Sequence, residues 1–251
     1  MNSAIFIGKP LYFSEHIKIY PPKLGDVLGN PLYGAFSLIF VNSQEDIWDR
    51  IAEEHGQDPI GTPIPDAPTP FEELLNNCYS SKEFMEIAKK AFLFFTGSQV
   101  RIIPERKIVL FYDSVNYAKE AKDLEVIDTD EKFFTFQNLI RQVLGDDPIE
   151  KPNLKMNKKV ALIKAKGRLR ERVKRKKGNV NGISFDAMLV ALCCMGIGLS
   201  PLNIGEIPYP AIQPLFETYQ RKEKYETDLK VATAGFGNSK VKPVYWIKNL
   251  K

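Results

Sequence analysis

The sequence predicts an α+β fold that is mostly helical, with a small N-terminal sheet and an all-α C-terminal region. Two stretches, near 4–20 and 99–127, are rich in the β-branched and aromatic residues that strands favour. Most of the remaining chain repeats apolar residues at the spacing of one face of a helix. No strand pattern occurs after residue 127, so we expect the rest of the chain to be helical.

Proline and glycine divide the part before residue 70 into short elements. Ser43, with Asp46 three positions later, is expected to cap a helix, because a serine hydroxyl accepts from a backbone N–H of the first turn. Residues 56–70 contain five prolines and two glycines, a composition typical of a surface loop. The elements expected before this loop are strands at 4–13 and 16–20, a helix at 24–28 and one or two helices within 33–54.

Start and stop signals also mark the helices after the loop. Thr69 and Pro70 have the order of an N-cap followed by a first-turn proline, and Asp130 is placed to cap a later helix. Gly97 and Gly145 are placed to end two of the helices. The expected elements are a helix from 70, a helix from 80 or 81 to 95, a hairpin of strands 100–104 and 107–112, a strand at 124–127 and a helix at 131–144.

The basic character of the chain is confined to one window. The net charge is +4, and Lys151–Lys177 contains 13 Lys and Arg residues against the single acid Glu171. Outside the window there are 22 basic and 30 acidic residues, so the remainder is acidic with a net charge of −8. We therefore expect an α+β domain at 1–150, a basic linker or helix at 151–182 and a helical C-terminal domain at 183–251.

Sequence signatures of catalysis and of metal binding are missing. His16 and His55 lie far apart, and the three cysteines show no Cys-x-x-Cys spacing. No glycine loop precedes a helix in the arrangement that binds phosphate, and no Gly-x-Ser-x-Gly is present. We therefore expect a protein that is not an enzyme, with no catalytic residues, no cofactor and no metal site.

The sequence also favours a cytoplasmic location. Its N-terminus lacks the pattern of a signal peptide. The longest nearly uncharged run, 187–204, contains Pro201 and falls short of the roughly 20 apolar residues that cross a bilayer. An odd number of irregularly spaced cysteines is typical of a reducing compartment.

The basic window is a candidate nucleic-acid interface, because cationic side chains displace counterions from phosphates. It contains no aromatic residue, so base stacking is not available there. A solvated helix or linker, or a segment that docks on an acidic protein surface, has the same pattern. The residues proposed for phosphate contact are Lys164, Lys166, Arg168, Arg170, Arg172, Lys174, Arg175, Lys176 and Lys177.

The densest apolar block, 183–219, has the pattern of a helix, a break, a turn and a second helix. Ser184 is placed as the first N-cap, and Gly196 and Gly198 are placed to end the first helix. The start of the second helix has too few polar or basic residues to bind in a DNA groove, which argues against a helix-turn-helix reader. The second helix repeats apolar residues at helical spacing: Ile212, Leu215, Phe216 and Tyr219.

Two apolar surfaces are candidates for contact with a partner. One is the groove between the two helices of this block, and the other is the aromatic tail with Tyr245, Trp246 and Ile247. The tail packing back on its own domain is the alternative. After residue 220 the second helix is polar on most faces, as is typical of a helix that projects from a core or meets a partner.

The segment GLSPLNIGEIPYPAIQPLFETYQRKE resembles the Gly-Leu-Ser-Pro segment of phage tail assembly chaperones. The C-terminal AGFGNSKVKPVYWIKNL resembles the ends of proteins from tail-gene regions of phages of Gram-positive hosts, so the resemblance covers 183–250. It implies a non-catalytic protein that binds the tape measure protein and helps to recruit tail tube subunits in the host cytoplasm. It also implies a structural or partner-contact role for the motif positions Gly198, Leu199, Ser200, Pro201 and Glu206.

The chain departs from that family in its greater length and in its α+β N-terminal region, which the resemblance does not explain. Two other functions stay open on the sequence. One is nucleic-acid binding through the basic segment 155–177, and the other is a structural or connector role in the virion. The sequence leaves the oligomeric state open.

Overall fold

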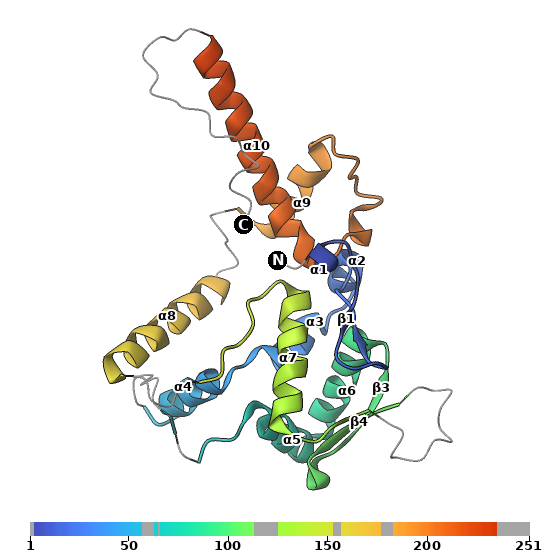
Figure 1. The fold of residues 1–251 in the computed structure, drawn as a ribbon, viewed down its shortest axis with the longest axis vertical. Coiled ribbons are helices and arrows are strands. Elements are labelled where there is room, and N and C mark those ends of the chain that lie inside the picture. Colours follow the sequence, from blue (N-terminus) through green and yellow to red (C-terminus); the bar gives the residue numbers. More distant parts are fainter. Residues whose placement is uncertain are drawn as a thin grey trace.

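The computed structural model of the chain describes residues 3–56, 63–64, 66–112, 125–152, 157–176 and 183–234 (Figure 1). It is mostly helical with small antiparallel sheets and a helical C-terminal region, so the predicted fold class is confirmed. The helices are α1 (Ser3–Phe6), α2 (Leu24–Leu28), α3 (Tyr33–Val41), α4 (Gln44–Glu54), α5 (Pro70–Ser80), α6 (Lys82–Thr96), α7 (Asp130–Leu144), α8 (Lys158–Lys176), α9 (Phe185–Cys194) and α10 (Ile212–Thr233). The strands are β1 (Leu11–Tyr12), β2 (Lys18–Ile19), β3 (Gln99–Ile103), β4 (Ile108–Tyr112) and β5 (Val126–Ile127), and the short 3-10 helices include η1 (Pro104–Arg106), η4 (Ile204–Glu206) and η5 (Tyr209–Ala211).

The described strands form two separate antiparallel sheets. β1 and β2 make a small ribbon in which Leu11 lies opposite Ile19. β3 and β4 form the predicted hairpin, with Gln99 opposite Tyr112, and β5 pairs with the other edge of β4. The two groups of strands expected from the sequence therefore belong to different sheets.

The expectation of one strand across residues 4–13 is wrong in its first half. Ser3–Phe6 form α1, and the Lys9 N–H donates to the Ala4 carbonyl at 2.8 Å. A short apolar run does not distinguish a strand from a helical turn. Here Ile5 is buried where α1 packs on η5, so a contact with a distant segment accompanies the helical form.

The larger hydrophobic core lies between α3, α5, α6, α7 and the sheet of β3, β4 and β5. Its centre is aromatic: the Phe40 ring lies 5.1 Å from Phe92 and 5.7 Å from Phe136 in edge-to-face geometry. All three side chains are fully buried. Alternate residues of the hairpin add Val100, Ile102, Val109 and Phe111, because successive side chains of a strand point to opposite faces.

Side-chain caps fix the starts of the helices around this core. Ser43 and Thr69 each form a reciprocal capping box with the acid three positions later, as expected for N-caps. α7 differs from the prediction, because its cap is Thr129, which accepts from the Lys132 N–H. Asp130 is already helical, and its carboxylate accepts a hydrogen bond from the Thr69 hydroxyl at 2.6 Å. This bond joins the starts of α5 and α7.

A second, smaller cluster holds the C-terminal helices to the N-terminal part. It comprises Met188 and Leu192 of α9, Ile212 and Phe216 of α10, and Leu24 of α2. α2 therefore packs with the 183–234 region although it lies near the start of the chain. Figure 1 shows that the first turns of α10 lie near α1 and α2, and that the later turns extend away from the rest of the protein.

Candidate partner-binding surface

α9 and α10 pack with their apolar faces together. Met188, Leu192 and Phe216 are 6%, 0% and 7% exposed and belong to one cluster. The groove expected between these helices is therefore filled by the chain's own side chains. Apolar surface for a partner must come from other parts of this region.

Two glycines shape the break after α9. Gly196 has φ of 66° and Gly198 has φ of 82°, a left-handed conformation that costs other L-residues about 1–2 kcal/mol. α9 ends at Cys194, so the expectation that these glycines follow its end is confirmed. The chain then returns Leu199 to the second cluster, where it is partly buried.

Asn203 closes the turn that follows. Its Oδ1 accepts from the Ser200 N–H at 2.8 Å, and its Nδ2 donates to the Gly198 carbonyl at 2.9 Å. The Ile204 N–H donates to the Ser200 carbonyl at 2.9 Å. Hydrogen bonds thus fix both sides of this turn, and Leu202 at its tip is 96% exposed.

Leu202 is a candidate contact residue that the sequence did not single out. The resemblance pointed to Leu199, Ser200 and Pro201, which shape or flank the turn. A usable signal was present, because Ser200 and Asn203 have the three-residue spacing with which short polar side chains close a turn. The residues between such a pair face solvent, and here they include a leucine.

Other exposed aliphatic side chains lie on the segments that precede this turn or pack on η4. Val190 of α9 is 63% exposed, Ile197 in the break is 48% exposed and Leu28 of α2 is 61% exposed. α2 packs directly on η4, the helix that follows the turn. Exposed apolar surface that is contiguous marks protein interaction sites, so these side chains are candidates for partner contact. We call Leu28, Val190, Ile197 and Leu202 the apolar rim.

Glu206, the last motif position, links η4 to α2. Its Oε2 lies 2.6 Å from Lys23 Nζ, and this hydrogen bond raises the pKa of Lys23 above its ordinary value. Beside it, the Leu24 N–H donates to the Ile207 carbonyl at 2.8 Å. Glu206 thus contacts the chain itself and aligns two of the elements that support the apolar rim.

The later part of α10 is polar and projects from the core, as expected. No side chain between residues 220 and 233 is buried. Charge pairs one turn apart, such as Lys222 with Glu226 at 3.7 Å, support the helix by a few tenths of a kcal/mol, roughly. Figure 1 shows this part extending beyond α9. It offers a partner a long, charged and accessible helix.

The predicted basic segment forms α8, which docks on α4 through Arg168. Arg168 Nε and Nη2 lie 2.9 Å and 3.1 Å from the two carboxylate oxygens of Asp49, and Nη1 lies 2.5 Å from Glu45. The Asp49 side chain is 2% exposed. Burial lowers the pKa of Arg168, but the hydrogen bond and charge of Asp49 with the charge of Glu45 outweigh it, so the pKa is raised. Arg168 is therefore engaged within the fold and is not available to a phosphate.

The remaining basic candidates divide into three groups. Lys164, Lys166 and Arg170 are exposed on α8, with Lys164 at 4.0 Å from Glu150. Arg172, Lys174, Arg175 and Lys176 belong to α8, but their side chains are outside what the structure describes. Lys177 and the tail residues Tyr245, Trp246 and Ile247 lie outside the described residues.

Reactive groups are sparse in the described part of the chain. Across its ranges, no three His, Cys, Asp or Glu side chains gather in a way that could hold a metal ion. Burial raises the pKa of the Cys78 thiol to about 12, so this cysteine stays protonated at neutral pH. None of the described helices has the length and apolar character that a membrane crossing requires.

Comparison with protein-family models, with curated proteins and with solved structures finds no match for this chain. The function is therefore inferred from the residues themselves. The feature they present most clearly is the apolar rim beside the projecting helix α10.

Proposed function

We propose that the chain is a non-enzymatic assembly protein that binds a long helical partner through the apolar rim. The observation that supports this most directly is Leu202, which is 96% exposed on a turn fixed by hydrogen bonds. A large apolar side chain in this position loses solvent contact only when another molecule covers it. A contact of this kind suits a client that exposes apolar helix faces.

The fixed geometry of the turn favours binding. Because Ser200, Asn203 and Gly198 hold the loop before any partner arrives, little backbone order has to be gained on association. The flanking rim residues supply further apolar contact. The charged surface of α10 beyond Phe216 provides an extended polar border of the kind found around interface centres.

The resemblance to phage tail assembly chaperones supplies the specific form of the proposal. In that form the client is the tape measure protein, tail tube subunits are recruited to it, and the complex forms in the host cytoplasm. Among the motif positions, Gly198 and Ser200 shape the turn, Leu199 anchors it in the second cluster and Glu206 ties it to α2. These contacts support a structural role for the motif, with Leu202 as the contact residue.

The test is capture of the client by co-expression. The candidate client, a tape measure protein, is expressed with wild-type protein, with Leu202→Asp and with Leu38→Asp. Leu38 is a matched control, because it is 63% exposed on α3, away from the apolar rim. Capture is measured after washing in about 1 M salt, where charges are screened beyond about 3 Å.

We expect wild type and Leu38→Asp to retain the client and Leu202→Asp to lose at least roughly tenfold, since a buried carboxylate in place of leucine opposes binding. Equal retention by all three proteins would remove Leu202 from the interface. Failure of wild type to hold the client would refute the proposed function.

Nucleic-acid binding is the second candidate, supported by exposed Lys164, Lys166 and Arg170 on α8. It predicts duplex binding that falls steeply between about 50 and 200 mM salt. Replacing these three residues by glutamine then abolishes it, whereas Leu202→Asp leaves it unchanged. Recovery of the chain from mature virions would instead support a structural or connector role.

A further inference from the structure

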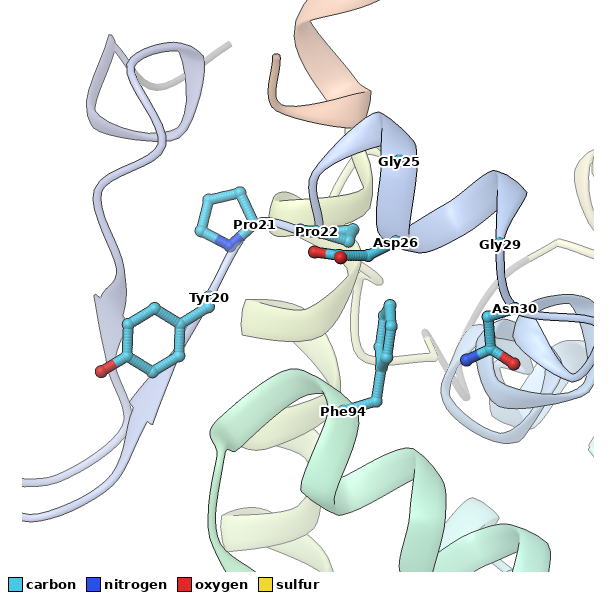
Figure 2. Close-up of a pocket in the computed structure, with 8 residues that line it drawn as sticks. All are labelled: Tyr20, Pro21, Pro22, Gly25, Asp26, Gly29, Asn30 and Phe94. Carbon is cyan, nitrogen blue, oxygen red and sulfur yellow. The ribbon is translucent and has the colours of Figure 1, made fainter. Parts of the chain in front are cut away.

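A cavity of about 450 Å³ lies where the segment before α2 meets the end of α6 (Figure 2). Tyr20, Pro21 and Pro22 form one side, α2 forms another, and Phe94 of α6 lies beneath. The cavity is next to the second cluster, because Leu24 of the same short helix is buried there. It is separate from the apolar rim but shares α2 with it.

A carboxylate and an aromatic ring face this cavity together. Figure 2 shows the Asp26 side chain above Phe94, with its carboxylate directed toward Pro22. Within the described chain, no hydrogen bond or ion pair engages Asp26, and its basic neighbour Lys23 is held 2.6 Å from Glu206. The fold therefore places a carboxylate in a concave site, and among the described residues its charge interacts with that of Lys23, whose hydrogen bond goes to Glu206.

The apolar walls of the cavity are fixed by packing. The Phe94 ring lies 5.9 Å from Tyr33, 5.6 Å from Phe36 and 5.1 Å from Phe95, and these contacts hold its orientation. Pro21 and Pro22 are buried and cannot rotate about φ. A ligand thus meets flat, preformed surfaces beside one carboxylate.

We infer that this cavity receives an arginine side chain of the partner protein. A guanidinium is planar, stacks on aromatic and flat apolar surfaces, and donates two parallel hydrogen bonds to a carboxylate. Lysine has a compact ammonium that does not stack, so it uses only the charge of Asp26. A hard metal ion requires several oxygen ligands, whereas among the described residues that line the cavity Asp26 is the only one with a carboxylate.

α2 contributes residues to both the apolar rim and the cavity, so a partner that binds both must match both surfaces. Leu28 on this helix belongs to the apolar rim, while Asp26 and Gly29 line the cavity. A partner seated on the rim reaches the cavity from the same helix. This step rests on the proposed function, and it describes the partner's contact segment as apolar residues followed by an arginine.

The test uses small molecules and the intact chain. Wild type, Asp26→Asn and Asp186→Asn are each titrated with N-acetyl-arginine amide, its uncharged citrulline counterpart and N-acetyl-lysine amide. Binding is followed through the backbone amide NMR signals of Gly25, Gly29 and Asn30. Asp186 is a matched control, since it is an exposed first-turn aspartate of α9. The NMR spectrum of each variant also reports whether it is folded.

We expect the arginine compound to shift these three signals in wild type and in Asp186→Asn. Its affinity for Asp26→Asn should be about tenfold weaker, the loss of one charge-assisted pair. The uncharged citrulline compound should also bind wild type weakly. Its affinity should be no higher than that of the arginine compound for Asp26→Asn.

Equal binding of the arginine and citrulline compounds, unchanged affinity in Asp26→Asn, or lysine binding as tightly as arginine would each overturn the inference. This assay contains no partner protein, so its failure leaves the Leu202 result intact. Conversely, arginine binding without client capture would refute the proposed function, while the cavity would remain an arginine-binding site.

Discussion

Gly198 and Leu202 show how single residues divide the work of the C-terminal turn. Gly198 supplies a φ of 82°, and its carbonyl accepts from Asn203, so it fixes the path of the chain. Leu202 contributes almost nothing to the core, because 96% of its surface is exposed. The path of the turn and the proposed partner contact therefore depend on different residues, and substitutions can separate them.

Gly198→Ala is expected to lower the free energy of unfolding by about 1 kcal/mol, because alanine disfavours a left-handed φ. A Cβ built on Gly198 meets nothing within 4 Å, so the cost comes from backbone conformation and not from a clash. Urea denaturation of wild type and of the variant measures this change in the free energy of unfolding.

Gly34→Ala is the control for this substitution. Gly34 lies in α3 without a positive φ, and a Cβ there also meets open space. We expect it to be neutral or to raise stability by up to about 1 kcal/mol, since alanine is the better helix former. Similar losses in both variants would show that the φ of Gly198 is not the cause.

Among the elements, α8 and α4 are joined by charge and not by a large apolar face. Only Ala161 and Ala165 are buried on the described part of α8, and both are small. The bidentate pair between Arg168 and Asp49 supplies the specific contact, with Glu45 at its edge. The most basic element is thus held by one of the acidic ones.

Arg168→Ala is expected to reduce the free energy of unfolding by about 2 kcal/mol, between the values typical of exposed and of buried ion pairs. The reason is that the Asp49 carboxylate, 2% exposed, loses the two hydrogen bonds that Arg168 donates to it. Chemical denaturation checks the loss, with Arg170→Ala as control.

Arg170 is an exposed arginine on the same helix, so its replacement is expected to change stability by no more than about 0.5 kcal/mol. If Arg168→Ala matched this control, the pair would hold α8 in place without contributing net stability.

At the scale of the whole molecule, the two hydrophobic clusters are joined by segments from both ends of the chain. Tyr33 lies between them, with its ring 5.9 Å from Phe94 and 5.7 Å from Tyr209. The hydrogen bond from the Leu24 N–H to the Ile207 carbonyl crosses the same junction. The proposed boundary at 150 therefore does not separate N- and C-terminal contacts in space.

The stability of the molecule is expected to decline in alkaline solution because of Cys78 in the larger core. Burial raises the pKa of this thiol from 9.0 to about 12. The stability that is linked to the protonated Cys78 thiol is fully present below pH 9. It is lost as the pH rises toward 12, because the thiol of the unfolded chain releases its proton at a lower pH. Urea midpoints of wild type should fall between about pH 9 and pH 11.

Cys78→Ala should be less stable at every pH, because it leaves a cavity, but its decline over the same range should be smaller. Cys194→Ala, which changes an exposed cysteine, should keep the full decline. A decline that persists unchanged in Cys78→Ala would assign the alkaline sensitivity to other groups.

The sequence by itself determined the helical class, the β3–β4 hairpin and most helix ends. Ser43, Thr69 and Ser184 cap the helices that follow them, and Gly97 and Gly145 end others, because these signals act within a few residues. The turn that presents Leu202 is closed by residues close in sequence, so the spacing of Ser200 and Asn203 is enough to indicate it.

Only the tertiary structure decided the contacts between distant residues. Arg168 meets Asp49 across 119 positions, and Lys23 meets Glu206 across 183. The same holds for the helical form of 3–6, the closure of the α9–α10 groove and the placement of Asp26 and Phe94 around one cavity. Periodicity fixes which face of an element is apolar, but it contains no information about which other element covers that face.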